Sequence, residues 1–280
     1  MLPAYAKLNL TLDILRKRPD GYHELRMVMQ RIALHDDVRV ALAPGEGIRC
    51  RCGAGLPEDE SNLAVRAARA FFAQSGVAPR ALEIDVVKRI PACAGMAGGS
   101  SDAAATLRAL RTLLCPEMDD AALERIGAQV GSDVPYCIRG GTVLAEGRGE
   151  LLTTLRSAPR LYALVCKPDF AISTPALYAR VRVDALRARP DTDGMLRAIA
   201  EGDAAGVIAR VGNVFEQVLP EAFSQVFAIK RALLAAGAES AAMTGSGSAV
   251  FGLFREKAAA EAARQSVQIP GAQVLLTEFV

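Results

Sequence analysis

The sequence predicts an α+β fold, and three observations support this class. Segments in which apolar and polar residues alternate, the pattern of a strand, occur near both ends of the chain. Segments with apolar residues at helical spacing lie between them. Strands and helices follow one another without the regular βαβ rhythm of a parallel sheet. The chain has 280 residues, a length that suits one large domain or two closely packed ones. Hydrophobic residues make up 51% of it, which is enough for a sizeable core.

The first predicted strand covers residues 4–14, with apolar side chains on one face and polar ones on the other, as in a half-buried strand. A turn follows at Pro19-Asp20-Gly21. We expect further strands at 25–34, 38–42, 48–52 and 81–88. Between the last two, residues 61–76 predict a helix that Ser61 or Asn62 caps and Gly76 ends.

Two helices are predicted next, over 101–114 and 120–130. Residues 161–168 then read as a buried strand, and short helices are expected over 174–236 because Pro and Gly interrupt this segment. The pattern at 238–254 predicts two strands joined by a Gly-rich turn. We expect a helix at 256–266 and a last strand at 272–280. The best candidate for a domain boundary is the segment 147–155, so we expect one domain at residues 1–152 and a second at residues 153–280.

Composition excludes several classes of function. Basic and acidic residues nearly balance, 33 against 31, and no basic run is long enough for a nucleic-acid surface. No apolar run approaches the length of a membrane span, and the N-terminus lacks the layout of a signal peptide. The six Cys include no C-x-x-C pair and there are two His, which argues against a zinc site. We expect a cytoplasmic protein with reduced thiols.

The stretch IPACAGMAGGSSDAAATLRAL, residues 90–110, follows a predicted strand and leads into a helix. Glycines let the backbone approach a ligand, and the first turn of a helix has unpartnered N–H groups and partial positive charge. This order predicts a phosphate site. A flexible turn before a Ser-capped helix is an equal alternative on spacing alone. The chain contains no G-x-x-x-x-G-K-[ST], G-x-G-x-x-G, D-F-G or H-R-D motif, so the common nucleotide-binding motifs are excluded.

The loop from Pro91 to Ser101 resembles the phosphate loop of the small-molecule kinase superfamily of galactokinase, homoserine kinase, mevalonate kinase and phosphomevalonate kinase. Three further segments resemble one branch of it: AKLNLTLDILRKRPDGYHEL, GSDVPYCIRGGTVLAEGRGE and MTGSGSAVFGLF. The resemblance implies a two-domain fold with a ribosomal-S5-like N-terminal domain and an α+β C-terminal domain. One departure is Ala97, where the family usually has Gly; alanine is tolerated there if its φ stays negative.

The resemblance also implies an activity. That branch transfers the γ-phosphoryl group of ATP to the tertiary 2-hydroxyl of a methylerythritol linked to cytidine diphosphate, in the non-mevalonate route to isoprenoids. The implied cofactor is ATP with Mg²⁺, which the ATP phosphates hold, with Ser100 or Ser101 as candidate contacts and no dedicated metal ligands. The implied partner is a small-molecule substrate, with no nucleic acid and no membrane, and the protein is expected to be a monomer or a weak dimer.

The family's functional positions carry over to matching residues of this sequence. The catalytic candidates are Lys7 and Asp133, with Asp133 as base and Lys7 as its charge partner. The substrate candidates are Asn9, Tyr22, His23, Thr174 and Tyr178, of which Tyr22, His23 and Tyr178 would hold the cytosine. The ATP candidates are Pro91, Ala92, Cys93, Ala94, Gly95, Met96, Ala97, Gly98, Gly99, Ser100, Ser101, Asn62 and Lys88, and the turn Gly245-Ser246-Gly247 would support them.

Each of these residues also has an ordinary structural interpretation. Lys7 and Asn9 could line the wet face of an edge strand, Asp133 could be a turn or cap residue, and Asn62 could cap a helix. Two rival functions remain. The first is another kinase of the superfamily, of homoserine or mevalonate type, against which DGYHEL and Tyr178 argue. The second is a non-catalytic RNA-binding protein of S5-like fold, against which the near-neutral charge and few aromatic residues argue.

Overall fold

The structure, a computed structural model, describes residues 1–53 and 55–280. The chain forms two compact units, each built from separated segments of sequence. The first unit contains residues 1–6, 34–91 and 97–140, and the second contains residues 7–33, 92–96 and 141–280. The domain boundary expected at residue 152 stays a prediction. Two long strands, β1 (Leu2–Lys17) and β2 (His23–Leu42), pass from one unit into the other along the chain.

In the first unit, the end of β2 pairs with β4 (Leu82–Val87), which pairs in turn with β3 (Ile48–Arg51). The β2–β4 pair is antiparallel, from Asp37 opposite Val87 to Leu42 opposite Leu82, and β3 runs parallel to β4. The two strands expected at 25–34 and 38–42 are one continuous strand. Polar residues do not interrupt it because the buried Asp36 carboxylate accepts hydrogen bonds from the backbone N–H groups of Arg89 and Ile90.

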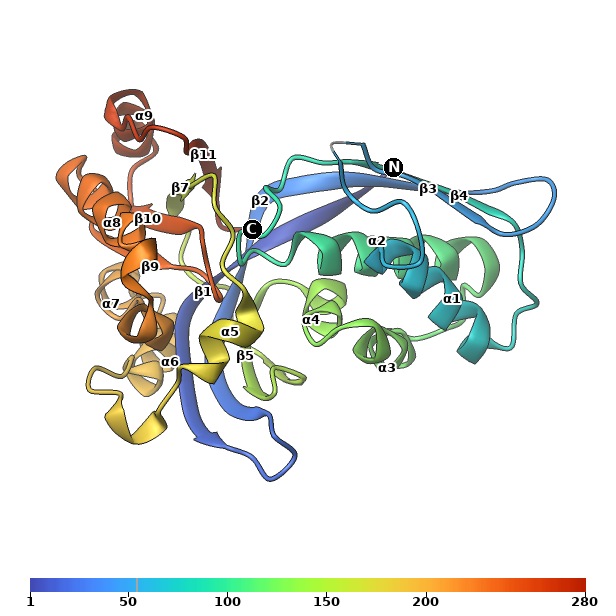
Figure 1. Cartoon of the computed structure of the whole chain (residues 1–280), viewed down its shortest axis with the longest axis horizontal. Coiled ribbons are helices and arrows are strands. Elements are labelled where there is room, and N and C mark those ends of the chain that lie inside the picture. The colour runs from blue at the N-terminus through green and yellow to red at the C-terminus, as the bar shows by residue number, and fades with distance from the viewer. Residues whose placement is uncertain (54) are drawn as a thin grey trace. The chain divides into compact units, whose positions relative to one another are not determined.

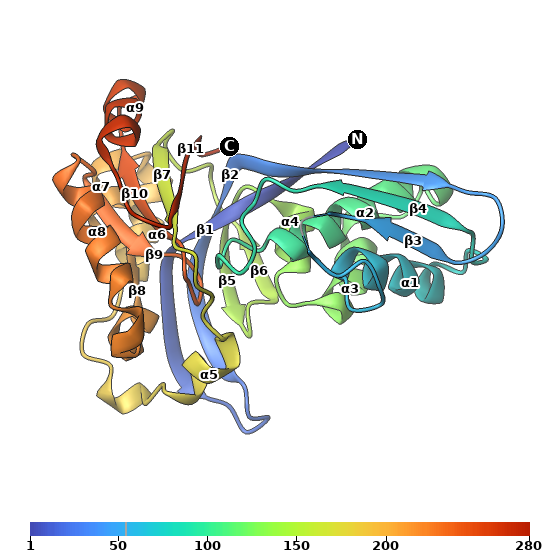
Figure 2. The same ribbon diagram turned by 45° about the horizontal axis from the view of Figure 1, so that its top comes forward.

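The first unit also contains α1 (Leu63–Ser75), α2 (Gly98–Leu114), α3 (Asp120–Val130) and α4 (Val134–Arg139). Figures 1 and 2 show these helices on one face of the strands β2, β4 and β3. A single apolar core lies between the two layers and includes Phe71, Leu82, Leu107 and Leu123. Burial of these side chains provides the main stabilisation of this unit.

Helix boundaries in the first unit follow local chemistry. The Asn62 side chain accepts a hydrogen bond from the Ala64 N–H, and Gly76 ends α1 in the left-handed conformation, φ 73°, as predicted. Helix α3 has the predicted bounds. Helix α2 begins at Gly98, three residues earlier than expected, because the backbone already closes a helical hydrogen bond from Ser101 N to Ala97 O.

In the second unit, β5 (Thr142–Gly147) pairs antiparallel with the first half of β2 and with β6 (Leu151–Thr154). The short β8 (Gly212–Asn213) pairs in parallel with β1. A separate four-stranded antiparallel sheet has the order β11-β7-β10-β9, with β7 at Tyr162–Lys167, β9 at Ser240–Met243, β10 at Val250–Phe254 and β11 at Gln273–Glu278. The strand–turn–strand pattern of residues 238–254 is thus confirmed.

The helices of the second unit are short, as predicted for 174–236. They are α5 (Thr174–Ala179), α6 (Thr192–Glu201), α7 (Ala204–Ala209), α8 (Gln225–Ala235) and α9 (Lys257–Ser266), with 3-10 turns η1 (Val183–Ala185), η2 (Val214–Val218) and η3 (Glu221–Phe223). Helix α8 packs against β9 and β10, and α9 packs against β7, β10 and β11 (Figure 2). These contacts cover the four-stranded sheet.

Strand β1 corrects one prediction. We expected a half-buried strand, but the polar side chains of Lys7, Asn9, Thr11 and Asp13 are only 4, 1, 0 and 6% exposed. These side chains find partners inside the second unit: the Thr11 hydroxyl accepts from the Val28 N–H, and the Asp13 carboxylate accepts from the Arg189 guanidinium at 2.7 Å. Burial of polar groups is tolerated because each is hydrogen-bonded.

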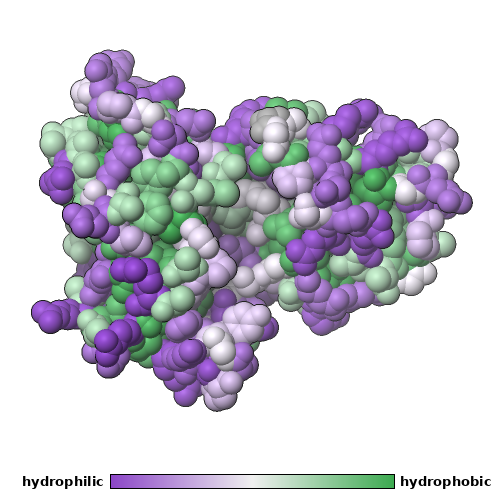
Figure 3. Space-filling model, in the orientation of Figure 1, coloured by the Kyte–Doolittle hydropathy of each residue, from purple (hydrophilic) through white to green (hydrophobic). Residues whose placement is uncertain are grey.

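Many surface residues are hydrophilic (Figure 3), as expected from a sequence in which 23% of the residues are charged. Hydrophilic residues are spread over the visible face in Figure 3. Within the described residues, no helix has the length and apolar character needed to cross a membrane. All six cysteines are free thiols.

Candidate functional site

The part of the phosphate loop that belongs to the second unit, residues 92–96, is bound by a buried polar network. The Lys7 ammonium donates to the Gly95 carbonyl at 2.8 Å and to the Asn9 side-chain oxygen at 2.6 Å. The same Asn9 oxygen accepts from the Gly245 N–H at 2.9 Å, and the Thr244 hydroxyl lies 3.3 Å from the Gly95 carbonyl. This network links strand β1, residues 92–96 of the loop and the Gly-rich turn.

A second set of bonds holds the loop to the turn. The Ser248 N–H donates to the Cys93 carbonyl and the Ala249 N–H to the Ala94 carbonyl, at 3.4 and 3.3 Å. A Cβ added at Gly95 would lie 2.2 Å from the Thr244 carbonyl oxygen, and Gly95 has φ +74°. Only glycine fits this position, because any side chain would meet backbone. The turn 245–247 therefore supports the loop structurally.

The remainder of the loop belongs to the first unit and forms the start of α2. Ala97 is the residue before the helix and has φ 59°, in the left-handed region. The condition under which alanine was expected to be harmless, a negative φ, is not met. A non-glycine residue in this conformation costs about 1–2 kcal/mol. The backbone N–H groups at the start of α2 still form the N-terminal turn that favours an anion.

The two serines of the loop differ in availability. The Ser101 hydroxyl is buried and donates to the Tyr5 carbonyl at 2.5 Å, whereas Ser100 is only partly buried. Of the two candidate Mg²⁺ contacts, Ser100 is the better placed. The described residues contain no group of three or more His, Cys, Asp or Glu that could hold a metal ion.

Lys88, a predicted ATP contact, is the centre of a buried ionic group in the first unit. Its ammonium hydrogen-bonds the carboxylates of Asp36 and Asp102, the latter at 2.7 Å. The second oxygen of Asp102 is buried and has no hydrogen-bond partner among the described residues. Burial raises the pKa of the Asp102 carboxyl to about 7, against the opposing attraction of Lys88. A Cβ at Gly98 would lie 3.4 Å from the Lys88 ammonium, so this charge is next to the start of α2.

Asn62, the other predicted ATP contact outside the loop, acts as a helix cap. Its side-chain oxygen accepts from Ala64 N–H at 2.9 Å, and its side-chain nitrogen donates to the Pro57 carbonyl at 2.7 Å. Both ends of the amide are thus occupied within the first unit. A role in adenine binding stays a prediction.

Asp133 immediately precedes α4 in the first unit. Its side chain is half-buried and caps no backbone N–H of the helix, but the residue lies in the turn that the Val134 N–H closes onto the Gly131 carbonyl, so of the two structural interpretations, turn or cap, the turn holds. Its backbone carbonyl accepts from Cys137 N–H at 3.0 Å, which fixes the main chain. The expected partnership between Asp133 and Lys7 stays a prediction.

The three predicted cytosine contacts gather in the second unit. The Tyr178 ring stacks on the His23 ring with centroids 5.1 Å apart, and its edge meets Phe215. Two rings at this separation leave no room for a base between them. The Tyr22 ring is 57% exposed, which leaves it available for stacking. Burial, with a smaller effect of the Lys17 ammonium, lowers the pKa of His23, which favours the neutral ring that both donates and accepts hydrogen bonds.

Thr174 begins helix α5, one residue after its cap Ser173. Its hydroxyl lies 2.6 Å from the Ser246 hydroxyl. This bond joins the segment that carries Tyr178 to the Gly-rich turn. The predicted substrate residue and the predicted supporting turn are therefore in contact.

Sequence reasoning missed four polar residues that contact the predicted ones: Asp36 and Asp102 in the first unit, and Thr244 and Arg148 in the second. Thr244 directly precedes the Gly-rich turn, and its position there was the available signal. Asp36 and Asp102 contact Lys88 from positions 52 and 14 residues away in sequence, a pairing that no local pattern shows. The guanidinium of Arg148 lies over the Tyr22 ring, 5.0 Å from its centroid.

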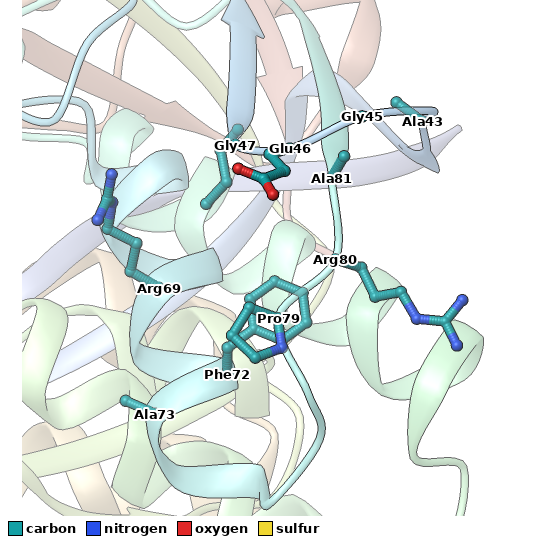
Figure 4. Close-up of a pocket in the computed structure, with 11 residues that line it drawn as sticks. Ala43, Gly45, Glu46, Gly47, Arg69, Phe72, Ala73, Pro79, Arg80 and Ala81 are labelled. Carbon is teal, nitrogen blue, oxygen red and sulfur yellow. The ribbon is translucent and has the colours of Figure 1, made fainter.

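A cavity of about 790 Å³ lies elsewhere in the first unit, where α1 meets the segment between β2 and β3. Figure 4 shows Arg80 extending away from the other labelled side chains. None of the predicted site residues lines this cavity. It is therefore no part of the candidate site.

Comparison with protein families gives two matches. Residues 62–141 match the family "GHMP kinases N terminal domain", and residues 195–273 match "GHMP kinases C terminal". Among curated proteins, the chain is 41% identical to a 4-diphosphocytidyl-2-C-methyl-D-erythritol kinase of Lachnoclostridium phytofermentans, over 99% of this chain and 96% of that protein. It is 43% identical to the enzyme of that name from Pelotomaculum thermopropionicum, over 98% and 96%.

Solved structures agree. A crystal structure of 4-(cytidine 5'-diphospho)-2C-methyl-D-erythritol kinase superposes with a TM-score of 0.84 at 31% identity, covering 99% of this chain and 98% of that one. The homoserine kinase of Cytophaga hutchinsonii superposes with a TM-score of 0.72 at 18% identity, covering 99% and 95%. The second likeness shows a shared fold alone. The α+β two-domain kinase fold expected from the sequence is confirmed.

The close approach of Gly95 to Thr244 predicts an asymmetry between two glycines. Gly95→Ala and Gly21→Ala both place a side chain at positive φ, +74° and +84°, but only at Gly95 does the new Cβ meet backbone. We expect Gly95→Ala to lower the free energy of unfolding by about 1–3 kcal/mol more than Gly21→Ala. Urea titration of both variants measures this. Equal losses would contradict the packing described for the loop.

The raised pKa of Asp102 predicts a pH dependence of stability. The folded protein holds the Asp102 proton up to about pH 7, whereas an unfolded Asp loses it near pH 4. The folded state therefore binds more protons in this window, and stability falls as pH rises from about 4 to about 7. Asp102→Asn removes this contribution, which amounts to at most about 4 kcal/mol for three pH units.

Urea unfolding at several pH values between 4 and 8, for wild type and Asp102→Asn, tests this. The difference in free energy of unfolding between the two proteins should change steadily through the window, with the variant gaining relative to wild type toward pH 8. A constant difference would show that Asp102 is already ionised at pH 5.

Proposed function

Because the chain belongs to the 4-diphosphocytidyl-2-C-methyl-D-erythritol kinases of the GHMP kinase family, we propose that it uses ATP to phosphorylate the 2-hydroxyl of 4-diphosphocytidyl-2-C-methyl-D-erythritol. The observation that carries this proposal is the contact of the Lys7 ammonium with the Gly95 carbonyl, which places a buried cation against the phosphate loop. A phosphoryl-transfer site needs a cation at this point, because charge builds on the transferring oxygens.

The phosphate loop supplies the nucleotide side of the reaction. Backbone N–H groups from Gly98 onward, at the first turn of α2, would cradle the ATP phosphates, and the small residues of the loop leave them accessible. Bound Mg²⁺ would neutralise phosphate charge, with Ser100 as the protein hydroxyl nearest this role. The chain's own contribution is position, since phosphoryl transfer requires little covalent chemistry from the protein.

Asp133 is the proposed base. A tertiary hydroxyl is crowded and weakly nucleophilic, so it must be held in line with the phosphoryl group and lose its proton as the bond forms. The Asp133 carboxylate caps no helix N–H and is half-buried, which suits a group that accepts this proton. Lys7 would offset the negative charge of the transferring group. Asn9, which shares the Lys7 hydrogen bond, would orient the substrate.

The cytidine end of the substrate is assigned to Tyr22, His23 and Tyr178. Tyr22 offers an exposed ring face, and stacking on an aromatic ring contributes about 1–3 kcal/mol per base. Neutral His23 can both donate to and accept from the base edge. Tyr178, whose ring stacks on that of His23, is proposed to cover the far face of the base. Thr174, at the start of the same helix, is proposed as a further polar contact.

The remaining proposals follow from surface and charge. We propose a cytoplasmic enzyme, a monomer or a weak dimer, that binds no nucleic acid. The net charge of +2 and the absence of tryptophan support the last point.

The first test is substrate choice. With ATP and Mg²⁺, the protein should phosphorylate the cytidine-diphosphate-linked methylerythritol and should leave homoserine and mevalonate untouched, because only the first carries a base for the aromatic residues. Coupled detection of ADP release with each of the three alcohols measures this. Turnover of homoserine or mevalonate, with none of the cytidyl substrate, would support the other branches of the family instead.

The second test concerns the chemistry. Asp133→Asn keeps the shape of the side chain but cannot accept a proton, so kcat should fall about 10²–10⁴-fold while both KM values stay within a few-fold. Lys7→Ala should also lose most activity. The double variant should be hardly worse than either single one, because residues that act together have non-additive effects.

Steady-state kinetics of the three variants, with circular dichroism to check folding, provides the comparison. If Asp133→Asn keeps more than about a tenth of the wild-type kcat, Asp133 only positions the hydroxyl. Additive losses in the double variant would separate Lys7 from Asp133.

A further inference from the structure

Arg148 lies beside the proposed cytidine site, in the turn between β5 and β6. Its guanidinium carbon is 5.0 Å from the centroid of the Tyr22 ring. Tyr22 is adjacent in sequence to His23, which stacks on Tyr178. The arginine therefore contacts one of the three aromatic residues that the proposed function assigns to the base, yet that function gives it no role.

The turn around Arg148 is well defined. Gly147 and Gly149 on either side have φ of +69° and +110°, conformations that suit glycine. The Glu150 carboxylate accepts from the Arg148 backbone N–H at 2.6 Å, and the Gly149 N–H donates to the Glu146 carbonyl at 3.0 Å. These bonds fix the main chain, so the direction in which Arg148 leaves the turn is set by the fold.

The guanidinium itself is only loosely held. Its nearest carboxylate is Glu150, at 3.7 Å, and it donates no hydrogen bond to any residue in the described part of the chain. Its side chain is 46% exposed. An exposed cation–π contact is weak, so little is lost when a stronger partner takes the guanidinium from the ring.

The neighbouring charges make a cation necessary here if an anion is to bind. Burial raises the pKa of the Asp20 carboxyl, but the Tyr22 N–H, the Arg18 guanidinium and, more weakly, the charge of Arg148 together lower it, so Arg148 lies close enough to act on Asp20. Arg18 is already paired with Asp20 and Glu24. Without Arg148, the carboxylates of Asp20 and Glu150 would repel a negatively charged ligand next to Tyr22.

We propose that Arg148 binds the diphosphate of the cytidine-diphosphate-linked substrate and so determines its affinity. This inference rests on the proposed function. When the base stacks on the exposed Tyr22 ring, the diphosphate of the same nucleoside comes within one arginine side chain of that ring. The planar guanidinium matches two phosphate oxygens at once, a geometry that a lysine cannot reproduce.

Lys17 is the rival cation. It is exposed and lies near His23, since its charge contributes to the lowered pKa of that ring. It makes no ion pair with any residue that the structure describes. Lys17→Gln is therefore the matched control, because it removes one positive charge from the same neighbourhood without touching the Tyr22 ring.

The experiment compares wild type, Arg148→Gln, Arg148→Lys and Lys17→Gln. Calorimetry measures the Kd of cytidine diphosphate and of cytidine for each protein, and steady-state kinetics measures KM for the cytidyl substrate and for ATP. We expect Arg148→Gln to weaken binding of cytidine diphosphate about tenfold or more, as for loss of a charge-assisted contact. Cytidine binding, KM for ATP and kcat should change less than threefold. Arg148→Lys should recover part of the loss, and Lys17→Gln should resemble wild type.

Three results would overturn the inference. Equal weakening of cytidine and cytidine diphosphate would mean that Arg148 supports the base site through the Tyr22 ring. If Arg148→Gln binds cytidine diphosphate with an unchanged Kd, Arg148 does not contact the diphosphate. If only Lys17→Gln weakens that binding tenfold, the diphosphate contact belongs to Lys17. Since the wild-type protein is assayed on the cytidyl substrate in the same series, absence of turnover there rejects the proposed function separately.

Discussion

Burial of the Lys7 ammonium is the interaction on which the rest of the site depends. A charge inside a protein is costly unless hydrogen bonds replace its water, and here the Asn9 side chain and the Gly95 carbonyl do so. The hydrogen bond to the Gly95 carbonyl holds the phosphate loop against β1. The Asn9 side-chain oxygen accepts from the Gly245 N–H, which holds the Gly-rich turn against the same strand. One buried cation thus fixes three segments that are far apart in sequence.

The first unit also buries a lysine ammonium, that of Lys88, but stabilises it with carboxylates. Lys88 is shared by Asp36 and Asp102, and Asp36 also accepts two backbone N–H groups, so it is fully satisfied. Asp102 is not, and burial raises its pKa toward neutrality. Two carboxylates and one ammonium leave a net negative charge in an apolar surrounding, and protonation of Asp102 relieves it. The group stabilises the segment before α2, although its electrostatic balance depends on pH.

The small residues of the loop determine how closely the backbone of the Gly-rich turn can pack against it. Gly95 has no space for a side chain because the Thr244 carbonyl occupies it. Ala97 stands at positive φ, a conformation that costs a residue with a side chain about 1–2 kcal/mol. The Thr244 hydroxyl and the Ser248 N–H bond the carbonyls of Gly95 and Cys93, which holds this part of the loop in place.

The sequence by itself determined the α+β class, the bounds of α1 and α3, the Gly-rich loop between β4 and α2 and, through its resemblance, the kinase family. These follow from local patterns: caps, periodicity and short motifs act over a few residues. It could not determine that both faces of β1 are buried, that α2 begins at Gly98, or that Ala97 has positive φ. Nor could it pair Lys88 with Asp36 and Asp102, or bring Arg148 to Tyr22. Only the tertiary structure decided these, because burial and charge pairing depend on residues that are distant in sequence and meet only when the chain folds.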